Sequence, residues 1–189
     1  WVGTAEGPVV FDGGGDIFNG HQGSRIKVEQ DGVLNYLFGE ETIYSIAVDG
    51  ANRKWFGTGS GVFVQSPAGN EEVASYTTDN SPLLDNRIID IAIDGNNGLV
   101  YIATNGGIMS VRTDAIDGGK LHSDEVYAWP NPVRPDYDGP IAIRGLARDA
   151  VVKITDVTGQ ILFETQALGG QAIWDGKDLK GQQAETGVY

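Results

Sequence analysis

The chain has 189 residues, of which 28 are glycine, 40% are hydrophobic and 21% are charged. This composition is too apolar for a disordered chain, and no apolar run approaches the roughly 20 residues that a membrane-spanning helix needs. Acidic residues outnumber basic ones by 26 to 13, and the net charge of −13 disfavours nucleic acids and anionic lipid surfaces as partners. The absence of cysteine excludes disulfides, thiolate catalysis and cysteine-bound zinc or iron–sulfur clusters.

Repeated segments dominate the first 112 residues. The segment Ile43–Gly50 (IYSIAVDG) returns 45 residues later as Ile88–Gly95 (IIDIAIDG). A second segment, Trp55–Val62 (WFGTGSGV), returns 46 residues later as Tyr101–Ile108 (YIATNGGI), and Trp1–Gly7 (WVGTAEG) is an earlier copy of it. Short apolar runs between Asp-Gly turns indicate strands, and a period near 45 residues is typical of one four-stranded propeller blade.

The repeat predicts an all-β fold in which residues 1–112 form the C-terminal blades of an incomplete β-propeller. Trp55 and Tyr101 should fill the space between neighbouring blades, and the small residues Gly57 and Ala103 should let backbones approach each other. The Asp-Gly pairs should form turns, because glycine accepts positive φ and aspartate can bond its own backbone. Since it opens within a repeat unit, we expect the chain to be a piece of a longer protein.

A glycine-rich insertion separates the first repeat copy from the second. Trp1 and Trp55 are 54 residues apart, and the surplus over the later spacing fits Asp12–Ser24. Insertions in repeat proteins often lie on the binding face. We therefore predict a ligand surface near this loop, made of Asp16, Phe18, His21, Arg25 and Lys27.

The repeat units resemble those of two-component-regulator-type propellers, in which a strand precedes Asp-x-x-Gly and Trp-x-Gly-Thr-x-x-Gly. The connector Tyr76–Ile88 is also similar to the connector of that repeat. Within it, Ser81–Arg87 is a weak helical candidate that we expect to be a turn. Tyr101-Ile-Ala-Thr departs from the Trp-x-Gly-Thr form, as would suit a terminal blade.

The repeat is lost after residue 112. Residues 113–126 are polar and lack alternation, which predicts a linker. Residues 127–189 contain short alternating runs and glycine turns but no helical pattern, and they predict a small β-sandwich. Its expected strands are Pro140–Arg144, Ala150–Thr155, Gln160–Glu164 and Gln171–Trp174.

This C-terminal part resembles the sorting domain of type IX secretion substrates and the related FlgD-like immunoglobulin fold. The resemblance implies that the domain docks on secretion or attachment machinery. Members of this family usually continue with a final strand, so the last strand here is expected to be incomplete. The residues that carry the resemblance, and are the candidate docking residues, are Pro130, Asn131, Pro132, Gly145, Asp156, Gly159, Trp174, Asp175, Gly176, Gly187 and Tyr189.

Together the two parts resemble the PorZ-like surface proteins of the type IX secretion system. The resemblance implies export to the cell surface or outer membrane of a Gram-negative bacterium, with secretion or attachment proteins as partners and lipopolysaccharide or another glycan as the candidate ligand. Two alternatives remain open at this stage. One is the periplasmic sensor region of a hybrid histidine kinase, and the other is the C-terminal tail of an exported enzyme.

Signatures of catalysis and metal binding are weak. His21 and His122 lie 101 residues apart, and neither has a ligand partner at a motif spacing. Ser60 does not fit a nucleophile elbow, because the residues two before and two after it are not glycine. The oxygen-rich turn Asp94–Gly98 lacks the spacing and the closing glutamate of a calcium-binding EF-hand loop. The sequence therefore predicts a binding protein without catalytic residues, metal or cofactor.

Overall fold

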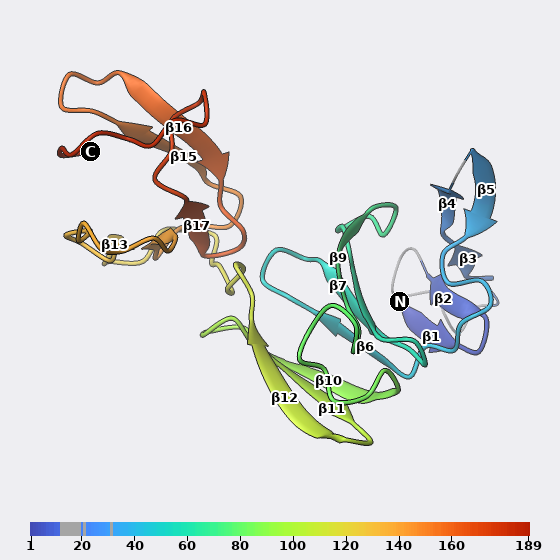
Figure 1. Cartoon of the computed structure of the whole chain (residues 1–189). Helices are drawn as coiled ribbons and strands as arrows, with labels where there is room; N and C mark the ends of the chain where they lie inside the picture. The colour runs from blue at the N-terminus through green and yellow to red at the C-terminus, as the bar shows by residue number, and fades with distance from the viewer. Residues whose placement is uncertain (12–19, 21, 31) are drawn as a thin grey trace. The chain divides into compact units, whose positions relative to one another are not determined.

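The chain folds into short antiparallel sheets joined by turns and loops (Figure 1). The computed structural model describes residues 1–11, 20, 22–30 and 32–189. These residues contain no helix, and the segment 81–87 is accordingly not helical. The expectation of an all-β protein is confirmed.

Two compact units make up the chain. The first consists of Trp1–Asp94 and Leu99–Arg112, and the second of Gly95–Gly98 and Thr113–Tyr189. In its described residues the first unit holds four antiparallel sheets, with strand orders β1-β2-β3, β4-β5, β6-β7-β8-β9 and β10-β11-β12. Their strands are β1 (Val2–Thr4), β2 (Gly7–Val10), β3 (Ser24–Arg25), β4 (Lys27–Gln30), β5 (Val33–Tyr36), β6 (Ser45–Val48), β7 (Lys54–Gly57), β8 (Val62–Gln65), β9 (Glu72–Tyr76), β10 (Ile88–Asp94), β11 (Leu99–Thr104) and β12 (Gly107–Arg112).

Strand β7 is buried along its whole length because a hydrophobic cluster lies on each of its faces. Successive side chains of a strand point to opposite faces of the sheet. Trp55 accordingly enters a cluster with Ile88 and Val100, whereas Phe56 enters another with Leu37 and Ile43. Strand β7 therefore packs against hydrophobic side chains on both faces of its sheet.

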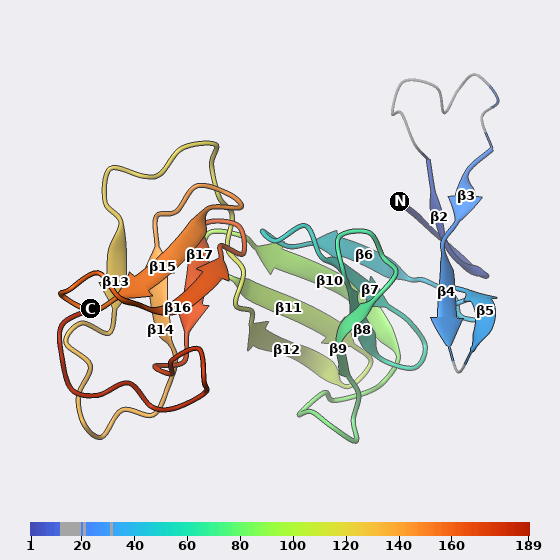
Figure 2. The ribbon, with the colours of Figure 1, turned by 90° about the horizontal axis from the view of Figure 1, so that it is seen from above.

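The sequence repeat is reproduced in the pairing of the strands. Trp55 pairs with Ala47 on β6 and with Val64 on β8. One repeat later, Tyr101 pairs with Ala92 on β10 and with Ser110 on β12. Figure 2 shows β10, β11 and β12 lying side by side. The repeated segments thus form equivalent hairpins.

The threonine of the repeat forms the same turn in each of the three copies. Its hydroxyl donates to the carbonyl of the residue three positions later and accepts the N–H of the residue two positions later. The residue three positions after the threonine is a glycine with positive φ, a conformation that residues with a Cβ rarely adopt. The donated bonds are Thr4 Oγ1 to Gly7 O (2.7 Å), Thr58 Oγ1 to Gly61 O (3.1 Å) and Thr104 Oγ1 to Gly107 O (3.0 Å), and the glycine φ angles are 87°, 139° and 135°.

The two aromatic residues predicted to fill spaces between blades differ in burial. Trp55 is 2% exposed, and its ring stacks on Tyr76 with centroids 5.7 Å apart. Tyr101 is 42% exposed, so within the described residues it does not fill a space between two sheets. The reason is that Tyr101 projects from the face of its sheet opposite to the buried Val100 and Ile102.

The second unit contains a three-stranded sheet with the order β13-β14-β17 and a two-stranded sheet, β15-β16. Four of its strands lie within two residues of the predicted ranges, whereas β13 was not predicted. Leu146, Ala167 and Ala172 form its buried cluster, with Ile143 and Val152 packed against them. The strands are β13 (Tyr127–Trp129), β14 (Ile141–Arg144), β15 (Val151–Thr155), β16 (Ile161–Gln166) and β17 (Gln171–Trp174).

Segment 113–126, which the sequence suggested as a linker, is hydrogen-bonded along the second unit. Ile116 N–H donates to Leu168 O at 3.3 Å, and Ile116 O accepts the Gly170 N–H at 2.8 Å. Ser123 N–H donates to Gly145 O at 2.8 Å. Much of the segment is thus held by backbone bonds to this unit.

Candidate binding surfaces

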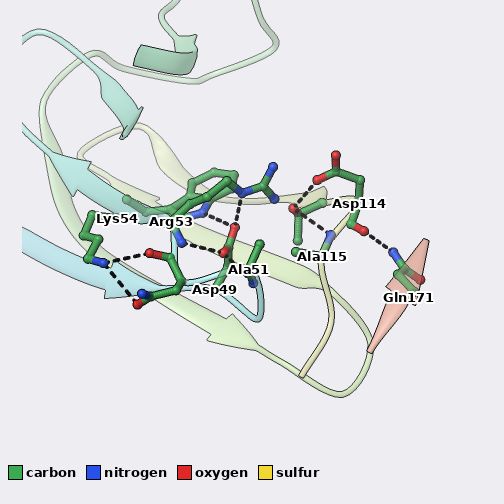
Figure 3. A network of polar contacts seen from close by, with 10 residues as sticks. Asp49, Ala51, Arg53, Lys54, Asp114, Ala115 and Gln171 are labelled. Atoms are coloured by element: carbon green, nitrogen blue, oxygen red, sulfur yellow. Dashed lines mark hydrogen bonds and ion pairs between the residues drawn. The ribbon is translucent and has the colours of Figure 1, made fainter. Parts of the chain in front are cut away.

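A buried carboxylate organises the turn between β6 and β7 (Figure 3). Asp49 Oδ1 accepts the N–H groups of Ala51 and Arg53, both at 3.0 Å. Its Oδ2 accepts Arg53 Nε at 2.7 Å and the Trp55 indole N–H at 3.0 Å. Asp49 was predicted as a turn former, and the structure adds its bond to the interior tryptophan. The carboxylate of Asp49 therefore has a structural role.

Lys54 follows on the same turn and is also buried. Its Nζ donates to Asn52 O at 2.8 Å and to Pro67 O at 2.7 Å. Burial lowers the pKa of Lys54 below its usual value, while the charge of Asp49 opposes this shift. These contacts connect the β6–β7 turn to the β8–β9 turn, so the ammonium group of Lys54 stabilises both turns.

The predicted ligand surface is described in part. Asp16, Phe18 and His21 lie outside the described residues. Arg25 and Lys27 both lie over the ring of Tyr36, with Arg25 Cζ 4.3 Å and Lys27 Nζ 5.9 Å from its centroid. These are cation–π distances. Arg25, Lys27 and Tyr36 are named the basic–aromatic site below.

The two cations of the basic–aromatic site differ in availability. Arg25 Nη2 donates to the backbone carbonyl of Glu6 and, at 3.4 Å, to that of Gly39. Its Nη1 lies 3.7 Å from the Glu6 carboxylate, and its buried Nε has no hydrogen-bond partner in the described structure. Lys27 is exposed. Arg25 is therefore largely structural, and Lys27 is the cation that a ligand can reach.

Two of the predicted docking motifs lie at the same end of the β13-β14-β17 sheet. Trp129 pairs with Ala142 on β14, and the preceding residue of β14, Ile141, pairs with Trp174. Strands β13 and β17 are both antiparallel to β14, so they run in the same direction. Residues 130–132 and 175–176, which follow β13 and β17, therefore lie at one end of the sheet, named the docking end below.

Trp174 anchors the docking end. It is 6% exposed, and its indole N–H donates to Lys177 O at 2.7 Å. Tyr189 packs edge-on against it with ring centroids 5.6 Å apart, and Gly187 lies next to the Tyr189 ring. Gly176 has a φ of 76°, which fits glycine in the turn after β17. The candidates Trp174, Gly176, Gly187 and Tyr189 are thus brought together.

The remaining predicted docking residues lie elsewhere and build turns. Asp156 Oδ1 accepts the Thr158 hydroxyl at 2.7 Å and the Gln160 N–H at 3.0 Å in the β15–β16 turn, which Gly159 completes. The bond from the Thr158 hydroxyl is the main reason that the pKa of Asp156 is lowered. Gly145, with a φ of 82°, follows β14 at the other end of the sheet.

Asp175 forms a similar local turn at the docking end. Its carboxylate accepts the Lys177 N–H at 3.0 Å and lies 3.2 Å from Lys177 Nζ. The backbone bond is the largest contribution to the lowered pKa of Asp175. Asp175 is exposed and stays ionised at neutral pH, so the docking end carries a local Asp–Lys pair.

Sequence reasoning did not identify the exposed aromatic pair on β13. Tyr127 is 50% and Trp129 is 63% exposed. They are two residues apart on a strand and so project from the same face. The sequence signal was the aromatic-x-aromatic spacing, but an edge strand of three residues is too short to be recognised by its pattern. Trp129 places a large apolar surface directly beside the docking end.

No group of three or more His, Cys, Asp or Glu side chains that could hold a metal ion is present in the described part of the chain. Within the same residues, no helix has the length and apolarity required to cross a membrane.

Comparison with known proteins gives one close structural match. No protein-family model and no curated protein matches the chain. A solved structure aligns with 99% of it at a TM-score of 0.63 and 33% sequence identity. The chain is similar to PorZ. PorZ is described as an essential bacterial surface component of the type IX secretion system of the oral bacterium Porphyromonas gingivalis. The chain spans 26% of the PorZ chain, and the expected resemblance to PorZ-like proteins is confirmed.

Proposed function

We propose that the chain is part of an exported, non-enzymatic surface protein of the type IX secretion system in a Gram-negative bacterium. The observation that carries the proposal is the similarity to PorZ at 33% identity over 99% of the chain. It favours this function over the sensor region of a histidine kinase and over the tail of an exported enzyme. In this proposal residues 1–112 are propeller blades, and residues 127–189 are an immunoglobulin-like sandwich of the sorting-domain type.

The propeller arrangement is supported by the way in which successive repeat units meet. Ile88 N–H donates to Thr58 O at 3.0 Å, and Ile43 N–H donates to Thr4 O at 2.9 Å. Ser45 Oγ also donates to Asp90 Oδ1 at 2.7 Å, and these two residues occupy the same position of the repeat. Equivalent contacts between consecutive units are what a propeller requires.

The second unit docks on proteins of the secretion or attachment machinery through the docking end. Pro130, Asn131 and Pro132 follow the exposed Trp129, and Val133 beyond them is 46% exposed. Aromatic side chains are enriched in the cores of protein–protein interfaces, and polar residues surround them at the rim. The exposed Trp129 beside these residues fits that pattern. The internal bonds of Trp174 and Tyr189 hold this end in shape.

Docking is tested in the full-length natural protein, expressed in its own bacterium. Deletion of residues 127–189 should abolish surface retention, measured by surface biotinylation. Trp129→Ala should weaken retention, whereas the control Val157→Ala, at a position 81% exposed in the β15–β16 turn, should not. Unchanged retention in the deletion variant would refute the docking role.

The first unit binds a glycan such as lipopolysaccharide through the basic–aromatic site. The exposed Lys27 offers a cation to an anionic substituent, and the neighbouring Tyr36, which is 46% exposed, offers aromatic surface to a sugar ring. This local positive charge stands out in a region, residues 1–124, that has 7 basic and 17 acidic residues. Asp16, Phe18 and His21 belong to the same proposed surface by their place in the sequence.

Glycan binding is tested with lipopolysaccharide purified from the producing bacterium. Lys27→Gln should weaken binding about two- to fivefold, the worth of one exposed ion pair. Lys120→Gln removes the same charge from an exposed position in the second unit and is the matched control. Equal affinity of the two variants would show that Lys27 does not contact the ligand.

A further inference from the structure

The two faces of the β13-β14-β17 sheet differ in what they contact. Trp129 pairs with Ala142, and Ala142 pairs with Ile173, so these three side chains form an apolar row across one face. The opposite face carries Ile143 and Ala172, which belong to the hydrophobic cluster inside the second unit. The row that begins at Trp129 therefore lies on the outer face of this sheet.

A second row crosses the outer face beside the first. Tyr127 pairs with Arg144, and Arg144 pairs with Gln171. Tyr127 is 50% exposed, Trp129 is 63% exposed and Arg144 is half-buried. Tryptophan, tyrosine and arginine are the residue types most enriched among those that dominate the binding energy of protein–protein interfaces. We name the surface formed by Tyr127, Trp129, Ala142, Arg144 and Ile173 the outer sheet face.

A buried glutamine fixes the position of Arg144 on the outer sheet face. Arg144 Nε donates to Gln171 Oε1 at 3.1 Å. Gln171 is 3% exposed, and its Nε2 donates to the backbone carbonyl of Asp114 (Figure 3). The guanidinium group is thus held in place before a partner arrives, which reduces the entropy that binding would cost.

The outward half of the Arg144 guanidinium is available to a ligand. The bond to Gln171 uses Nε, and within the described part of the chain it is the one polar contact of this side chain. Arg144 is also the one charged residue in the two rows of the outer sheet face. A guanidinium group matches the geometry of a carboxylate and binds it through two parallel hydrogen bonds. Charge complementarity therefore specifies a carboxylate on the occupant of this face.

We infer that the outer sheet face binds a partner protein that places a carboxylate on Arg144 and an apolar side chain on the row that begins at Trp129. This inference rests on the docking role proposed above and names the chemistry of the partner. Arg144 and Ala142 are two residues apart on β14, so the two contacts are about 6–7 Å apart. An extended segment with an acidic residue and an apolar residue at positions i and i+2 has the same spacing.

Photo-cross-linking identifies the occupant in the full-length natural protein, expressed in its own bacterium. Benzoylphenylalanine replaces Tyr127, and a second protein carries it in place of Trp129. A cross-link to another protein, at a segment in which Asp or Glu lies two residues from an apolar residue, supports the inference. A cross-link to the same polypeptide, to a second copy or to a segment without a carboxylate overturns it, as does the absence of a cross-link at both positions.

Charge reversal tests whether Arg144 receives the carboxylate. Arg144→Glu should lower the yield of the Tyr127-position cross-link at least about tenfold, because it opposes two negative charges at close range. Lys120→Glu, at an exposed position away from the outer sheet face, is the matched control and should leave the yield unchanged. Equal yields in the two variants would overturn the inference. If Arg144→Glu fails to fold, Arg144→Gln repeats the measurement, since its amide can still bond Gln171.

A compensating change in the partner separates recognition from a structural role of Arg144. Replacing the identified carboxylate by lysine should restore the cross-link to the Arg144→Glu protein, and no restoration would overturn the pairing. Deletion of residues 127–189 tests the docking role itself. Loss of retention in the deletion variant together with an unchanged cross-link in Arg144→Glu refutes this inference alone, whereas unchanged retention in the deletion variant refutes the proposed docking role.

Discussion

Asp49 should contribute more to stability than any other single carboxylate in the turns described above. Its side chain is fully buried and accepts four hydrogen bonds, one of them from the Arg53 guanidinium and one from the Trp55 indole. Asp49→Ala removes the charge facing Arg53 and leaves the indole N–H without this acceptor. Removing one partner of a buried ion pair typically costs about 3–5 kcal/mol. Urea unfolding of the 189-residue chain, followed by tryptophan fluorescence, should show a loss of this size.

Two further variants make the reasoning about Asp49 refutable. Asp49→Asn keeps the shape of the side chain but turns an amide N–H toward other hydrogen-bond donors. Its free energy of unfolding should therefore fall by about 1–3 kcal/mol, because buried polar groups are left poorly satisfied. Asp136→Ala, at an exposed position of the second unit, should change the free energy of unfolding by less than about 0.5 kcal/mol. Hydrogen exchange at the Ala51 and Arg53 amides should accelerate only in the Asp49 variants. A loss below about 1 kcal/mol for Asp49→Ala would refute the assigned role.

Three more outcomes are expected. Gly57→Ala should destabilise the first unit by about 1–3 kcal/mol through overpacking, whereas Gly59→Ala, where the nearest atom to a Cβ is 3.9 Å away, should be close to neutral in the same urea assay. Thr158→Val should raise the pKa of Asp156 toward its ordinary value, as measured by NMR titration. Because the folded pKa is lowered, this carboxylate stabilises the protein above its ordinary pKa, and the contribution is lost as pH falls through the folded pKa; an unchanged pKa would contradict the assigned hydrogen bond. Trp174→Ala should cost about 3–5 kcal/mol in the second unit, and an unchanged melting temperature of that unit would rule out its anchoring role.

Features that depend on local pattern could be predicted from the sequence. The Ile43–Gly50 and Ile88–Gly95 segments contain β6 and β10, and their Asp-Gly pairs end the strands. Alternation and turn chemistry act between residues that are close in the chain, so they are legible without a structure. The exception is β13, whose three residues carry too little pattern and which forms because β14 supplies its hydrogen bonds.

The candidate docking residues were identified by resemblance, but the sequence could not divide them by position. Pro130 and Trp174 are 44 residues apart in the chain and reach the same end of one sheet only because β13 and β17 both pair with β14. Asp156 matched the same motif equally well, yet it closes a separate turn. Proximity in this domain is set by strand pairing, which the residue types do not reveal.

The sequence by itself determined the all-β class, the 45-residue repeat and the turns at the Asp-Gly pairs, because each follows from short-range stereochemistry. Only the tertiary structure decided that Trp55 is buried and that Tyr101, at the same place in the repeat, is exposed. It likewise decided that Asp49 bonds Trp55 and that segment 113–126 is tied to the second unit. Burial depends on what packs against a strand, and that neighbour is specified by contacts between residues far apart in the chain.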